Sequence, residues 1–213
     1  MTFRIEVVSD VVCPWCFIGK RRLEQALHLL AAQEPDTKIE VVWRPFELNP
    51  QLPAEGMERS RYLELKFGNR APDIYARVGA VGRSVGIEFA FERIVRQPNT
   101  LPAHQLIELA RESNRQDAVV EALFRAYFLD GQDLSQADNL VQIAAAAGLD
   151  AAAAVACLAD DAQRAAVAER EEQARELGVG GVPFFIFAGQ LAVSGAQDAE
   201  VLVRAFRQAV ATV

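Results

Sequence analysis

The chain has 213 residues, of which 51% are hydrophobic and 24% are charged, and its formal net charge is −7. A chain of this length is long enough to bury a core, and the composition is typical of a globular protein. The negative charge argues against nucleic acid or an anionic membrane as a partner, because no basic stripe offsets it.

The first residues, MTFRIEVVSD, lack the basic start, apolar stretch and cleavage site of a signal peptide. No apolar run approaches the ~20 residues that a membrane-spanning helix needs. We therefore expect a cytoplasmic protein with no membrane partner. Structural disulfides are rare in such a reducing compartment, so the three cysteines of the chain need another explanation.

The N-terminal part of the sequence predicts a strand, a helix and a second strand. FRIEVVSDVV (3–12) is apolar and β-branched, which favours a strand of about seven residues. Apolar residues at nearly helical spacing predict a helix from Pro14 to about Gln33, and KIEVVWRPF (38–46) predicts a strand stopped by Pro45. With so short a crossover, we expect a parallel, right-handed βαβ unit.

Residues 57–177 show a helical pattern almost throughout, and their many alanines suit closely packed helices. Strand character returns in VPFFIF and LAVSG, which flank Ala188-Gly189-Gln190 and predict a hairpin. The last stretch, 196–210, predicts an amphipathic helix. Its inward positions are expected to be Val201, Leu202, Ala205, Phe206 and Ala209.

The predicted fold class is therefore α/β, with a helical insert inside one sheet domain. Residues 1–56 and 178–213 are expected to form the two parts of that domain, and residues 57–177 the insert.

Cys13 and Cys16 stand where the first strand gives way to the helix, and three interpretations compete. A structural zinc site needs about four nitrogen or sulfur ligands. The chain offers only Cys157, His28 and His104 besides this pair, so we expect no metal. A structural disulfide closing so short a loop would constrain little of the unfolded chain.

A redox pair explains the placement best. A cysteine at a helix start faces unpaired backbone N–H groups and the positive end of the helix dipole, which favour the thiolate. Cys13 is then the nucleophile, and Cys16, one turn further, resolves the mixed disulfide. Pro14 suits the first helical position. Trp15, between the cysteines, is expected either at the surface, where it would offer substrate an apolar docking face, or in a capping contact on the core.

Three segments resemble the DsbA-like thioredoxin-fold thiol–disulfide oxidoreductases, in the FrnE-like branch: SDVVCPWCFIGKRRLEQAL, WRPFELNPQLP and GVGGVPFFIFAGQLAVSGAQ. The resemblance spans nearly the whole chain. It implies a thioredoxin fold (βαβ then ββα) interrupted by a large all-helical insert. It also implies that Val182–Pro183 is a cis peptide bond facing the dithiol, where the backbone pairs with the substrate chain.

Two departures from this family limit what the resemblance implies. The dipeptide between the cysteines is Pro-Trp, whereas strongly oxidising periplasmic relatives carry Pro-His, and tryptophan cannot stabilise a thiolate as histidine can. The sequence also appears without a signal peptide. Both points favour reductase, isomerase or redox-sensing activity over bulk disulfide formation.

Other residues carry weaker predictions. Gln197 and Asp198 open the final helix and are a candidate glutathione or carboxylate site, against a plain helix cap. His104 is a candidate for the border of a substrate cleft, and Phe46 for either the groove or the core. A buried acid below the resolving cysteine is common in thioredoxin-like proteins, but neither Glu6 nor Glu40 is assigned to that place. Cys157 is expected to be a buried, inert thiol, and His28 a surface or packing residue.

The leading hypothesis is a thiol–disulfide oxidoreductase acting on disulfide-containing proteins or small thiols. It needs no bound cofactor, and glutathione or a thioredoxin is the expected reductant. One alternative is a glutathione-dependent isomerase or transferase acting on small aromatic molecules, whose known relatives carry serine where Cys13 stands. The other is a redox-controlled chaperone or binding protein.

Overall fold

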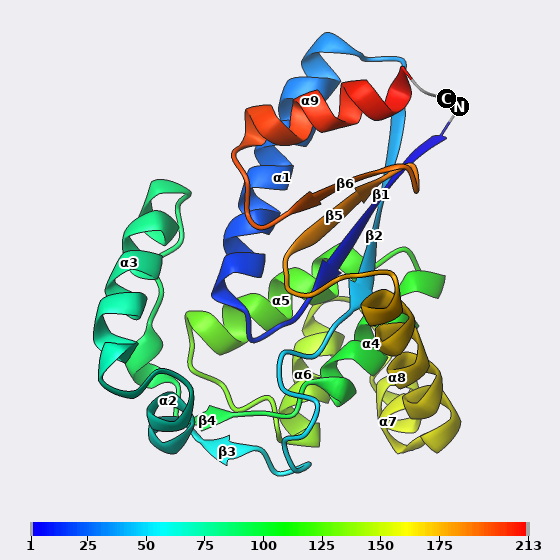
Figure 1. Ribbon diagram of the computed structural model, residues 1–213. Coiled ribbons are helices and arrows are strands. Elements are labelled where there is room, and N and C mark those ends of the chain that lie inside the picture. Colours follow the sequence, from blue (N-terminus) through cyan, green and yellow to red (C-terminus); the bar gives the residue numbers. More distant parts are fainter. Residues whose placement is uncertain (1, 212–213) are drawn as a thin grey trace.

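The structure, a computed structural model, describes residues 2–211. Strands and helices follow the chain in the order predicted, with additional short elements in the middle (Figure 1). The elements are β1 (Thr2–Ser9), α1 (Pro14–Gln33), β2 (Lys38–Pro45), β3 (Met57–Glu58), α2 (Arg59–Phe67), a 3₁₀ turn (Gly68–Arg70), α3 (Ala71–Ser84), a second 3₁₀ turn (Phe91–Arg93), β4 (Arg96–Gln97), α4 (Leu101–Glu112), α5 (Gln116–Phe128), α6 (Ala137–Ala146), α7 (Ala151–Ala159), α8 (Asp161–Glu176), β5 (Phe184–Phe187), β6 (Leu191–Ser194) and α9 (Ala199–Val210).

Within the described residues, the main sheet has four strands in the order β2-β1-β5-β6. β1 and β2 are parallel, with Ile5 opposite Val41, which confirms the predicted βαβ unit. β5 runs antiparallel to β1, with Val7 opposite Phe185, and β6 pairs antiparallel with β5. The two ends of the chain therefore build a single sheet, and the long middle region lies outside it.

Helices α1 and α9 pack side by side on one face of this sheet (Figure 1). The Phe3 and Phe206 rings, with centroids 4.4 Å apart, join β1 to α9. Leu202, Ala205, Phe206 and Ala209 of α9 are buried as predicted. Val201, expected to point inward, is only partly buried, and Val203 is buried in its place. At 3.6 residues per turn, position 201 falls at the margin of the apolar stripe.

The region between β2 and β5 is mainly helical but not entirely so. β3 and β4 form a two-stranded antiparallel sheet in which Met57 pairs with Gln97 and Glu58 with Arg96. The expectation of an all-helical insert is corrected on this point. Strands this short are too brief to show the alternating pattern by which a strand is recognised in a sequence.

Helix α1 is held between the sheet and the helical region. The Phe17 ring stacks on Phe124 of α5, with centroids 5.0 Å apart. The buried Lys20 ammonium lies 3.2 Å from Asp117 and 3.3 Å from Glu121, both on α5. These contacts fix the N-terminal half of α1, and with it the two cysteines, at the junction of the two regions.

Helix α5 also contacts the outer edge of the sheet. The Gln116 side chain accepts a hydrogen bond from the Trp43 backbone N–H and donates one to the Trp43 carbonyl oxygen, each 3.2 Å long. In this way one amide side chain takes the place of a neighbouring strand at Trp43.

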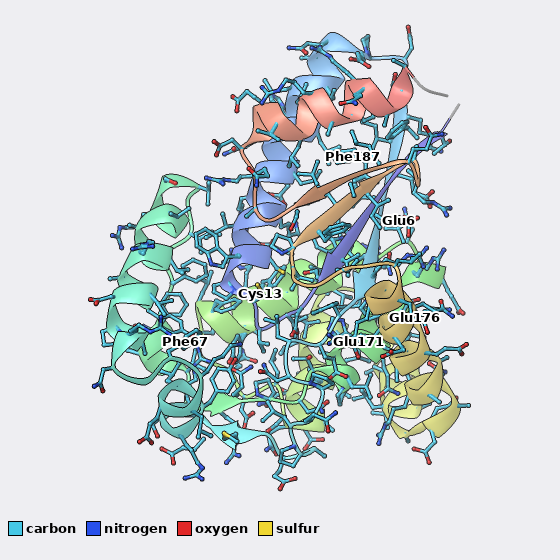
Figure 2. The ribbon with its side chains drawn as sticks, viewed as in Figure 1. Glu6, Cys13, Phe67, Glu171, Glu176 and Phe187 are labelled. Atoms are coloured by element: carbon cyan, nitrogen blue, oxygen red, sulfur yellow. The ribbon has the colours of Figure 1, made fainter. Side chains whose placement is uncertain are left out.

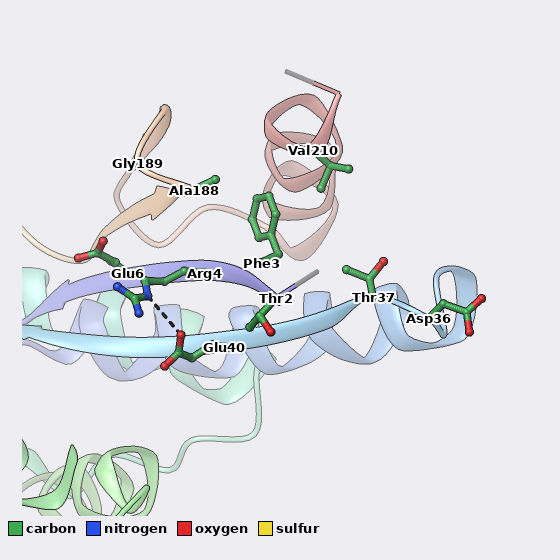
Figure 3. A pocket seen from close by; sticks show the side chains of 10 residues that line it. All are labelled: Thr2, Phe3, Arg4, Glu6, Asp36, Thr37, Glu40, Ala188, Gly189 and Val210. Carbon is green, nitrogen blue, oxygen red and sulfur yellow. Dashed lines mark hydrogen bonds and ion pairs between the residues drawn. The ribbon is translucent and has the colours of Figure 1, made fainter. Parts of the chain in front are cut away.

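A pocket of about 620 Å³ opens at the end of the sheet away from the cysteines. Its wall includes Phe3 and Val210, and the ion pair between Arg4 and Glu40 crosses its rim (Figure 3). None of the helices in the described range is long and apolar enough to cross a membrane.

Candidate active site

Cys13 occupies the position just before the first helical residue of α1. Its backbone is extended (φ −93°, ψ 110°), and its carbonyl oxygen accepts from the N–H groups of Cys16 at 3.0 Å and Phe17 at 3.4 Å. Pro14, which has no N–H to leave unpaired, is the first helical residue. The Cys13 sulfur thus stands at the positive end of a 20-residue helix, where the sheet meets the helical region (Figure 2).

In the described structure Cys13 and Cys16 are both free thiols, with 4% and 1% of their surfaces exposed. Burial, and then the neighbouring Cys13, raise the pKa of Cys16 well above its ordinary value. Hydrogen bonds from the Ser9 side chain and the Asp10 backbone act in the opposite direction. Cys16 is therefore a protonated thiol in this state and must lose its proton before it can attack.

The loop before β5 faces Cys13. The Cys13 thiol donates to the carbonyl oxygen of Val182 across 3.6 Å, and the peptide bond between Val182 and Pro183 is cis. The Pro183 carbonyl oxygen accepts from the Gly195 N–H at 2.8 Å, which ties the loop to the end of β6. The structure thus brings Val182 and Pro183 together with Cys13, although the two segments lie far apart in the sequence.

Helix α1 approaches this loop closely at Gly19. A β-carbon on Gly19 would lie 2.9 Å from Cγ of Pro183 and 3.3 Å from the Phe185 ring. Both contacts are tighter than side chains normally allow, so only glycine fits between the helix and the loop.

The two aromatic candidates near the site differ in burial. Trp15 is partly buried and packs against the core, in agreement with one of its two predicted roles. Phe46 is fully buried, and the Arg175 guanidinium lies 4.3 Å from the centre of its ring. Phe46 is thus a core residue and does not line an open groove.

The buried acid next to the cysteines is Asp10, which sequence reasoning missed. Its backbone oxygen accepts from the Cys13 N–H at 3.0 Å, and its carboxylate accepts from the Leu48 N–H at 2.8 Å. Glu6 and Glu40, the acids considered from the sequence, instead pair with Arg44 and Arg4, Glu6 at a partly buried position and Glu40 at an exposed one. The available signal was the place of Asp10, directly after the first strand and three residues before Cys13.

His104 is buried in the protein interior beside Asp10, so it does not border a cleft at the surface. It is 2% exposed, and its Nε2 atom is 3.2 Å from the Phe46 carbonyl oxygen and 3.6 Å from the Asp10 carboxylate. Burial lowers the pKa of His104, but the hydrogen bond and charge of Asp10, with the charges of Glu47 and Glu171, outweigh it and raise the pKa.

Glu47 is the second acid that the sequence did not reveal. It is 4% exposed, and its Oε2 atom has no hydrogen-bond partner among the described residues. Burial raises the pKa of Glu47 to about 7, while the His104 charge works against this shift. Its backbone N–H donates to Glu171 of α8 at 3.0 Å (Figure 2 labels Glu171), and its carbonyl oxygen accepts from Arg175 at 2.5 Å.

The remaining candidates lie apart from the dithiol. Cys157 is buried, its thiol lies 3.0 Å from the Gln163 side-chain oxygen, and burial raises its pKa to about 11. His28 is exposed on α1. Gln197 donates to Ser194 O at 3.0 Å, and Asp198 pairs with Arg22 at 2.9 Å. No group of three potential metal ligands occurs in the part of the chain that the structure describes.

Comparison with known proteins agrees with this geometry. The chain matches the family model of the DSBA-like thioredoxin domain over residues 4–207. A solved "probable DsbA oxidoreductase" from Streptomyces coelicolor is 34% identical, with 99% of this chain and 91% of that one covered and a TM-score of 0.87. The uncharacterized protein YwbO of Bacillus subtilis (strain 168) is 29% identical, with 96% of both chains covered.

A more distant structure is that of the cytosolic disulfide reductase DsbM from Pseudomonas aeruginosa, solved with GSH. It shares the fold at 16% identity, with 98% of this chain and 96% of that one covered and a TM-score of 0.58. Because the family model covers nearly the whole chain, the protein belongs to the family of DSBA-like thioredoxin domains, among the thioredoxin-fold oxidoreductases.

Proposed function

We propose that this protein is a thiol–disulfide oxidoreductase whose working groups are Cys13 and Cys16. The observation that carries the proposal is the position of the Cys13 sulfur, at a helix start and 3.6 Å from the backbone carbonyl oxygen of Val182. The helix start directs the positive end of its dipole at the attacking sulfur, and the carbonyl oxygen of Val182 offers a hydrogen-bond acceptor to the backbone of a substrate chain.

The reaction proceeds in two exchanges. The Cys13 thiolate attacks one sulfur of a substrate disulfide, a bond forms between protein and substrate, and the other substrate sulfur leaves as a thiolate. Cys16 then gives up its proton and attacks Cys13, and the second substrate sulfur leaves. The substrate gains two electrons and the protein is left with a Cys13–Cys16 disulfide; run backwards, the same steps form a disulfide in the substrate.

Reduction is the proposed direction, in the cytoplasm, with glutathione or a thioredoxin returning the protein to the dithiol. The Pro-Trp dipeptide supports it, since Trp15 offers no charge to stabilise the thiolate. Retention of both cysteines also favours redox exchange over a glutathione-dependent isomerase or transferase. The remaining alternative, a redox-controlled chaperone or binding protein, would bind peptides but show no turnover in a disulfide-reduction assay.

The Gln197–Asp198 corner remains the proposed contact for glutathione. The Asp198 carboxylate begins α9 and its side chain is 70% exposed, so it can exchange its partner Arg22 for the amino group of a tripeptide. The Asp198→Ala change is expected to weaken glutathione binding about tenfold, the effect of one charged hydrogen bond. Undiminished binding would remove this corner from the proposal.

Serine substitutions test the main assignment. Cys13→Ser is expected to abolish reduction of a disulfide peptide, and Cys16→Ser to accumulate a protein–substrate mixed disulfide that mass spectrometry detects. Cys157→Ser, the matched control, is expected to keep full activity because its thiol is buried and contacts Gln105 and Gln163 rather than the dithiol. Turnover by Cys13→Ser would refute the assignment.

Equilibration against graded mixtures of reduced and oxidised glutathione gives a second test. A reversible two-electron transition between about −120 and −270 mV would place the pair among working dithiol enzymes. A stable glutathione adduct on Cys13, with no internal disulfide at any potential, would instead support the isomerase or transferase.

A further inference from the structure

The α2–α3 segment (residues 59–84) differs in charge from the rest of the protein. It carries six arginine and lysine residues and two acids, a net charge of +4. Because the whole chain has a net charge of −7, the other 187 residues carry −11. No two of the six cations are adjacent in the sequence, so they form no basic run and are gathered only by the folding of two consecutive helices.

Most of these cations are exposed and lack an acidic partner. The exposed ones are Arg61, Lys66, Arg70, Arg77 and Arg83. Among the described residues none of the five forms an ion pair with a carboxylate, whereas Arg44, outside the segment, pairs with Glu6 at 2.6 Å. The charge on the surface of the α2–α3 segment is therefore available to a partner.

The sixth cation, Arg59, is buried and also lacks a carboxylate. It is 6% exposed, and within the described part of the chain its guanidinium donates only to neutral groups, among them the Gln97 side-chain oxygen and the Tyr75 hydroxyl. The Gln97 amide nitrogen in turn has no hydrogen-bond partner among the described residues. The segment is thus positive on its buried side as well as at its surface.

The α2–α3 segment lies beside the helix that carries both cysteines. α3 contacts α1 (Figure 1), and the Tyr75 ring packs on Phe91 with centroids 4.6 Å apart. Phe91 stacks on Phe89 at 4.7 Å, and Phe89 meets Phe17 of α1 at 6.1 Å. Burial raises the pKa of Tyr75, and the charge of Cys13 adds to that shift. The positive segment therefore lies within electrostatic reach of the attacking sulfur.

We propose that the α2–α3 segment is a docking surface for the acidic flank of a protein substrate and brings the substrate disulfide to Cys13. The inference rests on the proposed function and names its substrate class, disulfide-containing polypeptides with several Asp or Glu residues near the disulfide. The positive surface attracts such a chain while the negative remainder of the protein repels it, so the two molecules meet in one orientation.

The size of the segment favours an acidic polypeptide over other polyanions. α2 has 9 residues and α3 has 14, so the helices are about 14 and 21 Å long. Several residues of an extended chain, at about 3.3 Å each, fit within that length. Duplex DNA or an anionic membrane would extend past the segment onto surface that belongs to the negative part of the protein, which would repel it.

Three peptides that share one disulfide loop and one length, but have acidic, neutral or basic flanks, test the proposal on the unsubstituted protein. At about 20 mM salt, kcat/KM for the acidic peptide is expected to exceed that for the basic peptide at least about tenfold. At about 0.5 M salt the ratio should fall below about threefold, because the charges are screened. Equal values at low salt would overturn the inference alone, whereas no turnover of any peptide would refute the proposed function.

Two triple variants with the same total charge separate the effect of the segment from that of net charge. One carries Arg61→Glu, Arg70→Glu and Arg77→Glu, and the other carries Lys38→Glu, Arg111→Glu and Arg204→Glu, at exposed positions on β2, α4 and α9. The first should lose at least about tenfold in kcat/KM for the acidic peptide and keep the value for the neutral peptide within about twofold, which also reports correct folding. The second should lose less than about threefold. Equal losses in the two variants would overturn the inference.

Competition identifies the occupant of the surface. A peptide with the same acidic flanks, in which serines replace the cysteines, is expected to inhibit turnover of the acidic disulfide peptide competitively at low salt. A duplex DNA oligonucleotide and phosphatidylglycerol vesicles should inhibit less. Stronger inhibition by the DNA or the vesicles than by the serine peptide would assign the surface to nucleic acid or to a membrane and overturn the inference.

Discussion

Pro183 fills the space beside Gly19, so that a β-carbon on the glycine would lie 2.9 Å from Cγ of the proline. This contact joins the helix that carries Cys13 to the loop that carries Val182. On the same side of the loop, the Cys13 sulfur lies 3.6 Å from the Val182 carbonyl oxygen, so packing at Gly19 and the geometry of the site involve the same two elements.

Gly19→Ala is expected to push the loop away from the helix. The added methyl group must displace Pro183 or Phe185, at a cost of about 1–3 kcal/mol, which exceeds the ~1 kcal/mol that alanine gains over glycine within a helix. We expect lower stability in urea and a kcat/KM for a disulfide peptide reduced about tenfold, since small misplacements of reacting groups slow catalysis strongly.

Gly79→Ala is the matched control for that change. Gly79 also lies inside a helix, but its nearest neighbour would be an arginine side-chain nitrogen at 3.7 Å, an ordinary contact. Alanine there should raise the unfolding free energy by about 0.5–1 kcal/mol and leave kcat/KM unchanged. Equal behaviour of the two variants would show that the Gly19–Pro183 contact does not position the site.

Glu47 makes the stability of the protein depend on pH. Folding raises its pKa from 4.5 to about 7, so between these values the native state holds a proton that the unfolded state has released. Stability therefore falls as the pH rises through this range, by roughly 3 kcal/mol in total, and Glu47→Gln removes the effect because glutamine does not ionise.

Urea unfolding at pH 4.5, 6 and 8 checks this expectation. The unfolding free energy of Glu47→Gln minus that of the parent protein should increase steadily toward alkaline pH. Glu40→Gln should show no such trend, as Glu40 is exposed. A constant difference for Glu47→Gln across the three pH values would contradict the burial of a carboxyl that resists ionisation.

Lys20 connects α1 to the helical region through its charge. Its side chain is 2% exposed and contacts Asp117 and Glu121 of α5 as well as Glu24. Lys20→Met keeps the length of the side chain but removes a buried cation from three carboxylates, of which Glu24 and Glu121 keep Arg21 as a partner. The change should cost about 1–2 kcal/mol, since the carboxylates also keep some contact with water. Lys38→Met, at an exposed position on β2, should change stability by less than about 0.5 kcal/mol in the same urea titration.

The sequence predicted the N-terminal and C-terminal parts of the sheet domain well, because their strands and helices follow simple periodic patterns. The bounds of α1, Pro14–Gln33, agree with the predicted helix, and proline and a polar turn mark its two ends. β3 and β4, with two residues each, escaped prediction because they are recognised only through their pairing. Ala188 and Gly189, both with positive φ, form the hairpin turn that was predicted for Ala188-Gly189-Gln190.

The site was predictable only where a motif marks it. The spacing of Cys13 and Cys16 and their place before a helix are visible in the sequence. Asp10, Glu47 and His104 come from three separate segments, and nothing along the chain shows that they meet. Their grouping depends on the packing of α4 and α8 against the sheet, which is a property of the assembled structure.

The contact between Gln116 and Trp43 has a consequence for association between molecules. β2 is an edge strand, and unpaired edges invite strands from other chains. At Trp43 the outward N–H and carbonyl groups are already bonded to the Gln116 amide. Toward its start β2 carries the exposed charges of Lys38 and Glu40, which also discourage pairing. The helical region thus protects this edge of the sheet against aggregation, independently of any part it takes in the chemistry.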